Sequence, residues 1–284
     1  MGKRGGGTSP PAGDVATENG LGGDVAHTKD VQFATPAGKA LIPAGKFMMG
    51  CLSGDGDCTV DESPQHQIDL PAYYMDITEV TAAAYKKCVD VGKCTKPDSS
   101  SYCSPRYYGT YGASGKEQHP VNCVNWLQAD TFCKWTDAKG RLPTESEWEK
   151  AARGGLHGKK YPWGDQTPTC TPGQPNTVVW GDGSNTDGCG TDSTWAVGTG
   201  SSKNTYGLYD MSGNVWEWVN DWYGDSYYGS SPASNPQGPG SGSVRVKRGG
   251  SFDEVTSLRA SSRDVFKPSY VGGSVGFRCA RSLP

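Results

Sequence analysis

Residues 207–222 read GLYDMSGNVWEWVNDW, a stretch that combines large aromatic rings with many polar side chains. Three tryptophans fall between positions 216 and 222, and two acids, Asp210 and Glu217, lie on either side of Gly213. Tryptophan rings are suited to a core, but buried carboxylates are costly unless they are paired or hold a metal ion. The residues alone favour the interpretation that the acids cap turns and face solvent.

The composition of the 284-residue chain favours an irregular, loop-rich fold. Only 34% of the residues are hydrophobic, yet there are 9 Trp and 14 Tyr, whose N–H and O–H groups need partners in a core. The 41 Gly and 19 Pro are typical of turns rather than helices. The formal charge of −3 and the lack of a dense Lys/Arg run argue against a nucleic-acid partner, and no stretch predicts a transmembrane segment.

Ten cysteines are present, an even number, and no two of them have the CxxC spacing of a zinc ribbon or a redox site. Disulfides form in oxidising compartments, so the cysteine usage predicts a periplasmic, cell-surface or secreted protein. A cytosolic protein with buried free thiols is the alternative. Ten cysteines allow on the order of a thousand pairings, so their number alone fixes no bridge.

Residues 1–35 are rich in Gly and Pro and are predicted to form a disordered tether, followed by one folded domain at residues 36–284. The tether shows no apolar h-region of a signal peptide. Our hypothesis is that a signal or a lipoprotein leader with its lipid anchor lies upstream of this sequence, because such tethers commonly follow such leaders. An upstream genomic sequence without an apolar leader would contradict it.

Regular elements are predicted mainly in the first half of the folded domain. Residues 39–51 alternate apolar and small residues and are predicted to form a strand or hairpin. Helical spacing begins at Thr78 and continues to Cys88. The clearest helix lies within residues 120–140, where Gly140 is a stop signal.

A further helix is predicted within residues 141–155. It carries a capping box, because Glu147 follows Thr144 by three positions. Beyond Gly154 the pattern predicts only short strands and long loops, without an internal repeat.

Eight short motifs follow one another along the chain from about residue 38 to its end. Together they resemble the formylglycine-generating enzyme family, also called the sulfatase-modifying-factor domain. The resemblance implies an α+β fold that is irregular, low in regular secondary structure, disulfide-rich and related to the C-type lectin fold. The motifs are IPAGKFMMG, EVTAAAY, HPVNCVNWLQADTFCKW, GRLPTESEWEKAARGG, YPWGD, GLYDMSGNVWEW, RVKRGGSF and VGFRCAR.

The resemblance also implies two structural calcium ions. In the family, the segment equivalent to residues 207–222 wraps a calcium ion with side chains and main-chain carbonyls. Calcium takes such oxygens from a tightly curled loop, so the residue types suit it. The three tryptophans would then be core rings that shape the loop. The implied ligands are Asp210, Gly213, Val215 and Glu217 for one ion, and Asn176, Thr177, Asp187 and Cys189 for the other.

The resemblance implies one disulfide, which joins Cys133 to Cys279. That bridge would close a very large loop and constrain the unfolded chain. In the chain-entropy model this stabilises the folded state by on the order of 4 kcal/mol. If it forms, the remaining eight cysteines fall into local pairs: Cys51 with Cys58, Cys88 with Cys94, Cys103 with Cys123, and Cys170 with Cys189.

The sequence departs from the family at the residues of the family's reaction. Its enzymes oxidise a substrate cysteine to formylglycine with oxygen, a copper ion and a pair of reactive cysteines that follow the GGS motif. Here no cysteine lies between Cys189 and Cys279; the first family cysteine falls on Glu254, and the segment of the second is shortened. A carboxylate does not replace a thiolate that binds soft copper(I). We therefore expect no bound copper, no catalytic residues and no formylglycine formation.

A set of charged and aromatic residues falls where the family has its substrate cleft. Such a mixture suits the binding of a protein, peptide or glycan. The alternative is that these are ordinary loop residues, with Arg259 and Arg263 paired to Asp253 and Glu254, since fold does not imply function. The set comprises Phe252, Asp253, Glu254, Arg259, Ser261, Arg263, Asp264 and Phe266.

Three functions are consistent with these features. The first is an exported binding module that uses its C-terminal loops and is silent for cysteine oxidation. The second is a metal-dependent oxidase or sulfatase-modifying enzyme with an altered active site. The third is a structural component of the cell envelope, which would self-assemble.

Overall fold

The computed structural model describes residues 35–183, 187–200, 203–254 and 256–283. The predicted tether at residues 1–35 lies outside these residues apart from its last position. No helix in the described part of the chain is long and apolar enough to cross a membrane.

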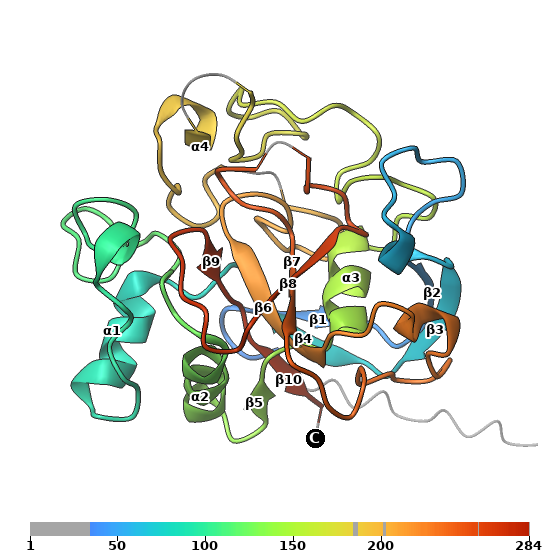
Figure 1. The fold of residues 1–284 in the computed structure, drawn as a ribbon, viewed down its shortest axis with the longest axis horizontal. Coiled ribbons are helices and arrows are strands. Elements are labelled where there is room, and N and C mark those ends of the chain that lie inside the picture. The colour runs from blue at the N-terminus through green and yellow to red at the C-terminus, as the bar shows by residue number, and fades with distance from the viewer. Residues whose placement is uncertain (1–34, 184–186, 201–202, 255, 284) are drawn as a thin grey trace, which may run out of the picture. The chain divides into compact units, whose positions relative to one another are not determined.

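Short elements joined by long loops make up the described fold, as the resemblance implies (Figure 1). The longest helix has 11 residues and the longest strand has 7. The helices are α1 Ala82–Asp90, α2 Trp126–Thr136, α3 Glu145–Arg153 and the single turn α4 Asp187–Gly190, with 3-10 turns η1 Val60–Glu62, η2 Ser101–Cys103 and η3 Tyr227–Gly229. The strands are β1 Lys39–Ile42, β2 Gly45–Met49, β3 His66–Leu70, β4 Tyr73–Asp76, β5 Gly140–Arg141, β6 Trp216–Trp222, β7 Arg245–Arg248, β8 Arg263–Phe266, β9 Val275–Gly276 and β10 Ala280–Ser282.

Side-chain caps decide where the three longer helices begin. The capping box predicted for α3 is confirmed, since Thr144 accepts from the Glu147 amide and the Glu147 side chain accepts from the Thr144 amide. Helix α1 begins after Thr81, whose hydroxyl accepts from the Ala84 amide, so the start predicted at Thr78 is three residues too early. Likewise, α2 ends at Thr136, before the predicted stop at Gly140.

Three sheets lie in the described residues, and two of them join distant parts of the chain. The strand orders are β1-β4-β10-β5, β2-β3 and β8-β7-β6-β9. Strand β10 is antiparallel to both β4 and β5, which places the last strand inside its sheet. Strand β6 is antiparallel to β7 but parallel to β9, so the tryptophan-rich segment lies at the centre of the third sheet.

The tryptophans of the opening stretch take two different positions. Trp216 and Trp218 are fully buried, together with Trp148 from α3. Trp222 is half-buried, and the Arg245 guanidinium lies 3.5 Å from the centroid of its ring. Two tryptophans are therefore core rings, as predicted, and the third is covered by a cation–π contact.

All ten cysteines are paired in five disulfides. The bridge between Cys133 and Cys279 spans 146 positions and ties α2 to the chain just before β10. The other four span between 6 and 20 positions. The pairing agrees with the one that the resemblance and the remaining local pairs imply.

Helix α3 is buried on all sides, although it carries three glutamates. Glu145 and Glu149 each accept hydrogen bonds from the fully buried Arg248, at 2.8 and 2.7 Å. Glu149 also pairs with Arg153 at 2.7 Å, and Glu145 with Arg263 at 2.7 Å. Arginines from α3, β7 and β8 thus compensate the acids on a helix that contacts protein on every face.

Asp221 lies in this region and forms no ion pair with another described residue, and burial, aided by the charge of Glu145, raises its pKa to about 8. Between about pH 4 and 8 the folded protein holds a proton that the unfolded chain has released, so the free energy of unfolding falls as pH rises. Asparagine has no proton to lose, so we expect Asp221→Asn to remove this loss. The free energy of unfolding of the variant minus that of wild type should therefore increase by a few kcal/mol from pH 5 to pH 8. Denaturant unfolding at both pH values measures it.

The matched control for that experiment is Asp225→Asn, which changes an exposed carboxylate four positions away. Its stability relative to wild type should be independent of pH. A constant difference between Asp221→Asn and wild type across the same range would contradict the raised pKa.

Candidate functional site

Arg259 and Arg263, expected in a ligand cleft, form buried ion pairs with acids from distant segments. Arg259 donates to the Glu62 carboxylate at 2.5 and 2.6 Å, and Arg263 donates to Glu145 at 2.9 and 2.7 Å. Their pairing with the acids at 253–254, the alternative drawn from the sequence, is therefore wrong. Both arginines line a cavity of 390 Å³, but their charges are compensated within the protein.

Two further members of the expected cleft set are part of the packed interior. Phe252 is 1% exposed, and its ring centroid lies 5.6 Å from that of Tyr108. Ser261 is also buried and accepts a hydrogen bond from Arg259 at 3.0 Å. These two residues support the loops and offer little surface to a ligand.

Glu254, expected from the resemblance to stand where the family has its first reactive cysteine, lies beside a buried lysine and a tryptophan. The indole of Trp216 donates to the Glu254 carboxylate at 3.4 Å. The Lys247 ammonium lies 3.9 Å from the Trp216 ring centroid, 4.2 Å from that of Phe266, and 2.8 Å from Asp264. Burial lowers the pKa of Lys247, while its pairing with Asp264 acts in the opposite direction. Glu254, Asp264 and Phe266 thus surround one lysine, and no thiol lies among them.

A separate cavity of 370 Å³, here called the tyrosine cavity, is lined by two loops and by one residue of the expected set, Asp253. Its aromatic wall extends over several rings: Tyr102 stacks on Tyr108 at 6.3 Å, and Tyr270 stacks on Phe266 at 3.7 Å. The sequence analysis missed the loops, although a tyrosine-rich stretch between two cysteines was their signal. The lining residues are Asp98, Ser100, Ser101, Tyr102, Cys103, Tyr108, Asp253, Tyr270, Val271, Gly272, Gly273 and Ser274.

The tyrosine cavity has a negative electrostatic environment. Its charged lining residues are Asp98 and Asp253, and neither forms an ion pair with another described residue. Burial raises the pKa of Tyr108, and the charges of Asp192, Asp187 and Asp253 raise it further. Asp98 accepts hydrogen bonds from Ser100, Asp253 accepts one from Ser251, and the charge of Asp253 also acts on Lys247. Tyrosine faces beside such carboxylates are suited to binding a cationic group.

The loop expected to hold one calcium ion is tightly curled. Asp210, Gly213 and Asn214 have φ values of 55°, 75° and 61°. A side chain at Gly213 would place its Cβ 2.3 Å from the carbonyl oxygen of Val179, so the loop requires glycine there. This is the backbone form from which carbonyl and carboxylate oxygens converge on a cation.

Three buried carboxylates gather at that loop around one guanidinium. Glu217 accepts from Arg278 at 2.7 to 3.0 Å and from the Trp148 indole at 2.8 Å. Asp210 and Glu79, both less than 5% exposed, add two more carboxylates whose charges act on Arg278. The oxygens of Glu217 already have donors, and Oδ2 of Asp210 accepts from the Gly198 backbone amide at 2.5 Å, so a bound cation would depend mainly on Glu79.

Glu79 supplies the observation that tests whether a cation fits. Its Oε1 accepts from the side-chain amide Nδ2 of Asn214 at 3.0 Å, while its buried Oε2 has no partner among the described residues. Burial and the charge of Asp210 raise the pKa of Glu79 well above its usual range. A divalent cation here would satisfy Oε2 of Glu79, although the carboxylate oxygens of Glu79, Asp210 and Glu217 do not all lie within 4.8 Å of one another. The sequence analysis missed Glu79, although it begins the quoted motif EVTAAAY.

The segments expected to hold the second calcium ion lie side by side. The Cys189 amide donates to the Trp180 carbonyl at 3.0 Å, and the sulfur of Cys189 lies 3.1 Å from the Val178 carbonyl oxygen. Burial raises the pKa of Asp187, and the charge of Asp253 raises it further. An acid in such surroundings is suited to a cation. The predicted ligands in these segments are Asn176, Thr177, Asp187 and Cys189.

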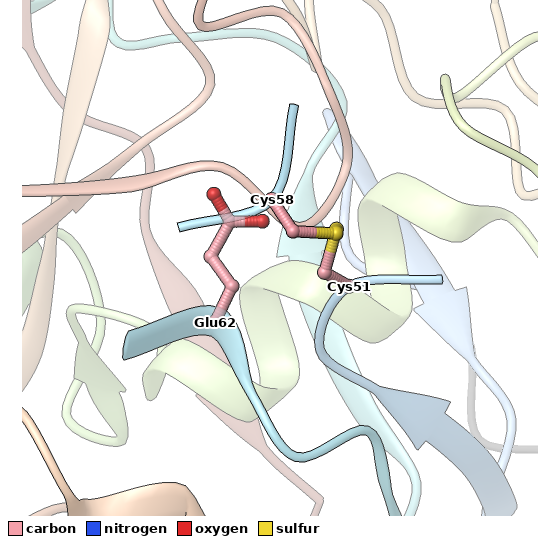
Figure 2. A group of neighbouring side chains, drawn as sticks. All are labelled: Cys51, Cys58 and Glu62. Atoms are coloured by element: carbon pink, nitrogen blue, oxygen red, sulfur yellow. A yellow bond between two sulfur atoms is a disulfide. The ribbon is translucent and has the colours of Figure 1, made fainter. Parts of the chain in front are cut away.

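One group of potential metal-ligating side chains lies within 4.8 Å of one another in the described part of the chain, namely Cys51, Cys58 and Glu62. Figure 2 shows the Glu62 side chain beside the sulfur atoms, which are joined to each other. A disulfide offers no thiolate to a metal. Because the Glu62 carboxylate also pairs with Arg259, this group is structural.

Comparison with known proteins agrees with this architecture. The Streptomyces coelicolor formylglycine-generating enzyme is 35% identical in an alignment that covers 86% of this chain and 88% of that protein. The mouse protein named inactive C-alpha-formylglycine-generating enzyme 2 is 30% identical, with 85% and 84% covered. The solved structure of PvdO from Pseudomonas aeruginosa has the same fold, with a TM-score of 0.69, 24% identity, and 86% and 94% covered. Since the model of the sulfatase-modifying factor enzyme 1-like domain also matches residues 25–283, this chain belongs to the FGE-sulfatase family.

Proposed function

We propose that this protein is an exported binding module of its family, silent for cysteine oxidation, that recognises a protein, peptide or glycan ligand through the tyrosine cavity. The tyrosine cavity supports this proposal, because it combines exposed rings with two carboxylates that have no cationic partner among the described residues. Tyr102 is 68% exposed and Tyr270 is 36% exposed, so their faces are available to a ligand. The proposed ligand presents a positive charge, such as a lysine or arginine side chain or an amino sugar.

The state of the cysteines supports the proposal that the protein does not oxidise a substrate cysteine, because the family's reaction needs reactive thiols. All ten cysteines are in disulfides, and Glu254 stands at the place of the first reactive cysteine. A mouse relative carries the word inactive in its name, so loss of activity within the family has a precedent. Incubation of the protein with a sulfatase-motif peptide, oxygen, reductant and copper should leave the peptide mass unchanged. Conversion of its cysteine to an aldehyde would instead support the altered-enzyme alternative.

The binding proposal is tested with arrays of peptides and glycans that are either cationic or neutral. We expect retention of cationic members only, and at least tenfold weaker binding for the double variant Asp98→Asn, Asp253→Asn. The matched control is Asp90→Asn on α1, an acid that pairs with Lys86 away from the cavity lining. Equal retention of neutral members, or unchanged binding by the double variant, would contradict the proposal.

Five disulfides favour an oxidising compartment, and we propose that the module works in the periplasm, at the cell surface or in the medium. Recovery of the protein from the extracytoplasmic fraction of its host, with all cysteines oxidised, is the expected result. Free thiols in the native protein would contradict it.

We further propose that two calcium ions stabilise the domain. The buried Oε2 of Glu79 and the acid-rich surroundings of Asp187 support this proposal. An ion that binds only the folded state adds about 2.7 kcal/mol of stability at one hundred times its dissociation constant. Chelator should therefore lower the melting temperature, measured by calorimetry, by several degrees, and added calcium should restore it.

Two variants separate the calcium sites. Asp210→Asn should abolish one part of the calcium-dependent stabilisation, and Asp187→Asn the other part. Magnesium is the control, since it prefers smaller octahedral sites and should restore less of the stability. A melting temperature that is the same with chelator and with calcium would contradict both sites.

A further inference from the structure

A cavity of 190 Å³ at the end of α3, here called the basic cavity, is lined by cationic residues and by no carboxylate. Its walls come from β2, from α3 and from the loop that follows α3. None of the residues assigned to the tyrosine cavity or to the calcium sites lines it. The basic lining residues are Lys46, Lys150, Arg153 and His157.

Lys150 is the most unusual of these residues. It is 4% exposed, and within the described chain its ammonium makes one side-chain hydrogen bond, to the Gly45 carbonyl at 2.7 Å. No described carboxylate lies within ion-pair distance, and Asp69 acts on it only from farther away. Burial lowers the pKa of Lys150 accordingly. A buried ammonium with one neutral acceptor is costly, and an anion in the cavity would compensate it.

The other cations differ in how much charge they leave for a ligand. Arg153 pairs with Glu149 at 2.7 Å and adds no net charge. Lys46 and His157 are exposed, and neither side chain forms an ion pair within the described residues. One surface ammonium, of Lys46, and the imidazole of His157 thus join the buried Lys150 around the same cavity.

Backbone amides of the loop after α3 add further donors. Gly154 and Gly155 have φ values of 57° and 77°, which turns the chain sharply at the helix end. The amides of Gly155, His157 and Gly158 donate to no acceptor among the described residues. Successive amides in such a turn form a concave surface that binds anions.

The carbonyls at the end of α3 do not oppose an anion, because other groups already occupy them. The Ala151 carbonyl accepts from Asn204 at 2.7 Å, and the Arg153 carbonyl accepts from the Leu156 amide at 2.9 Å. The Gly154 carbonyl accepts from the Thr205 hydroxyl. The negative end of the helix is thereby neutralised next to the cavity.

We infer that the basic cavity is a binding site for a tetrahedral oxyanion, a sulfate or phosphate group. Residues with N–H donors from β2, from α3 and from the loop after α3 line it together, and charge-assisted hydrogen bonds from such donors are suited to a sulfate or phosphate group. The group is either a free ion or an ester on a larger molecule. The inference concerns a different cavity from the proposed ligand site and does not depend on it.

The test is calorimetric titration of the whole protein with sodium sulfate, sodium phosphate, O-phosphoserine and glucose 6-sulfate at constant ionic strength set with chloride. We expect saturable binding, weakened at least tenfold by Lys150→Met. The double variant Lys46→Ala, His157→Ala changes only exposed side chains and should also weaken binding several-fold, which keeps the test valid if Lys150→Met does not fold. Tighter binding of the two esters would assign the site to a modified macromolecule. Tighter binding of the two inorganic ions would assign it to a free anion.

The matched control is Lys93→Ala, which removes an exposed lysine outside the cavity lining and should bind all four probes as wild type does. Absence of saturable binding, or equal binding by wild type and by the double variant, would overturn the inference. His157 provides an independent readout, because its imidazole NMR signals should shift on addition of sulfate but not of chloride.

Discussion

Replacing Arg278 by methionine should lower the free energy of unfolding by about 3 to 5 kcal/mol, measured in chelator by denaturant titration of tryptophan fluorescence. Arg278 is fully buried and is the cation that pairs with Glu217. Its guanidinium also donates to the carbonyl of Tyr209 at 3.0 Å. Without it, the carboxylates of Glu217, Asp210 and Glu79 would share a buried site with no opposite charge.

Rescue distinguishes this charge effect from lost packing. Addition of Glu217→Gln to Arg278→Met removes one uncompensated charge and keeps an acceptor for the Trp148 indole, so part of the stability should return. The matched control is Arg281→Met, three positions along the chain, whose pair with Asp137 is partly exposed and should contribute less than about 1 kcal/mol. Equal losses for Arg278→Met and Arg281→Met would contradict this account.

Removing the bridge between Cys133 and Cys279 by alanine substitution should have the second large effect. The bridge spans 146 positions, and the chain-entropy model gives a loss of roughly 5 kcal/mol for a loop of that length. The same model gives roughly 2 kcal/mol for the bridge between Cys51 and Cys58, which spans 7 positions. Unfolding of both double variants under identical conditions measures the difference, and a larger loss from the short bridge would contradict the ranking.

Local features of the fold could be predicted from the sequence because their causes lie within a few positions. The capping box of Thr144 and Glu147 is one example, since donor and acceptor are three residues apart. The disulfides required the family resemblance for Cys133 and Cys279, after which closeness in sequence indicated the other pairs. The start of α1 was misplaced because both Thr78 and Thr81 are suitable caps, and tertiary packing decides between them.

The partners of the cleft arginines could not be predicted in the same way. Arg259 pairs with Glu62 across 197 positions, and Arg263 with Glu145 across 118 positions. The nearest acids in sequence were the wrong choice, because the fold brings helix α3 and turn η1 against these side chains. The tyrosine cavity depends on similar long-range contacts, between loops near residues 100 and 270.

The position of β10 makes one sheet depend on contacts between distant parts of the chain. Strand β10 lies between β4 and β5, and Ala280 pairs with Met75 of β4 and with Arg141 of β5. Because loop-closure entropy must be lost before such non-local contacts stabilise the chain, they form slowly. We therefore expect this sheet to close late in folding, after the local turns of α1 and α3, and Cys279, which directly precedes β10, to reach Cys133 at the same stage.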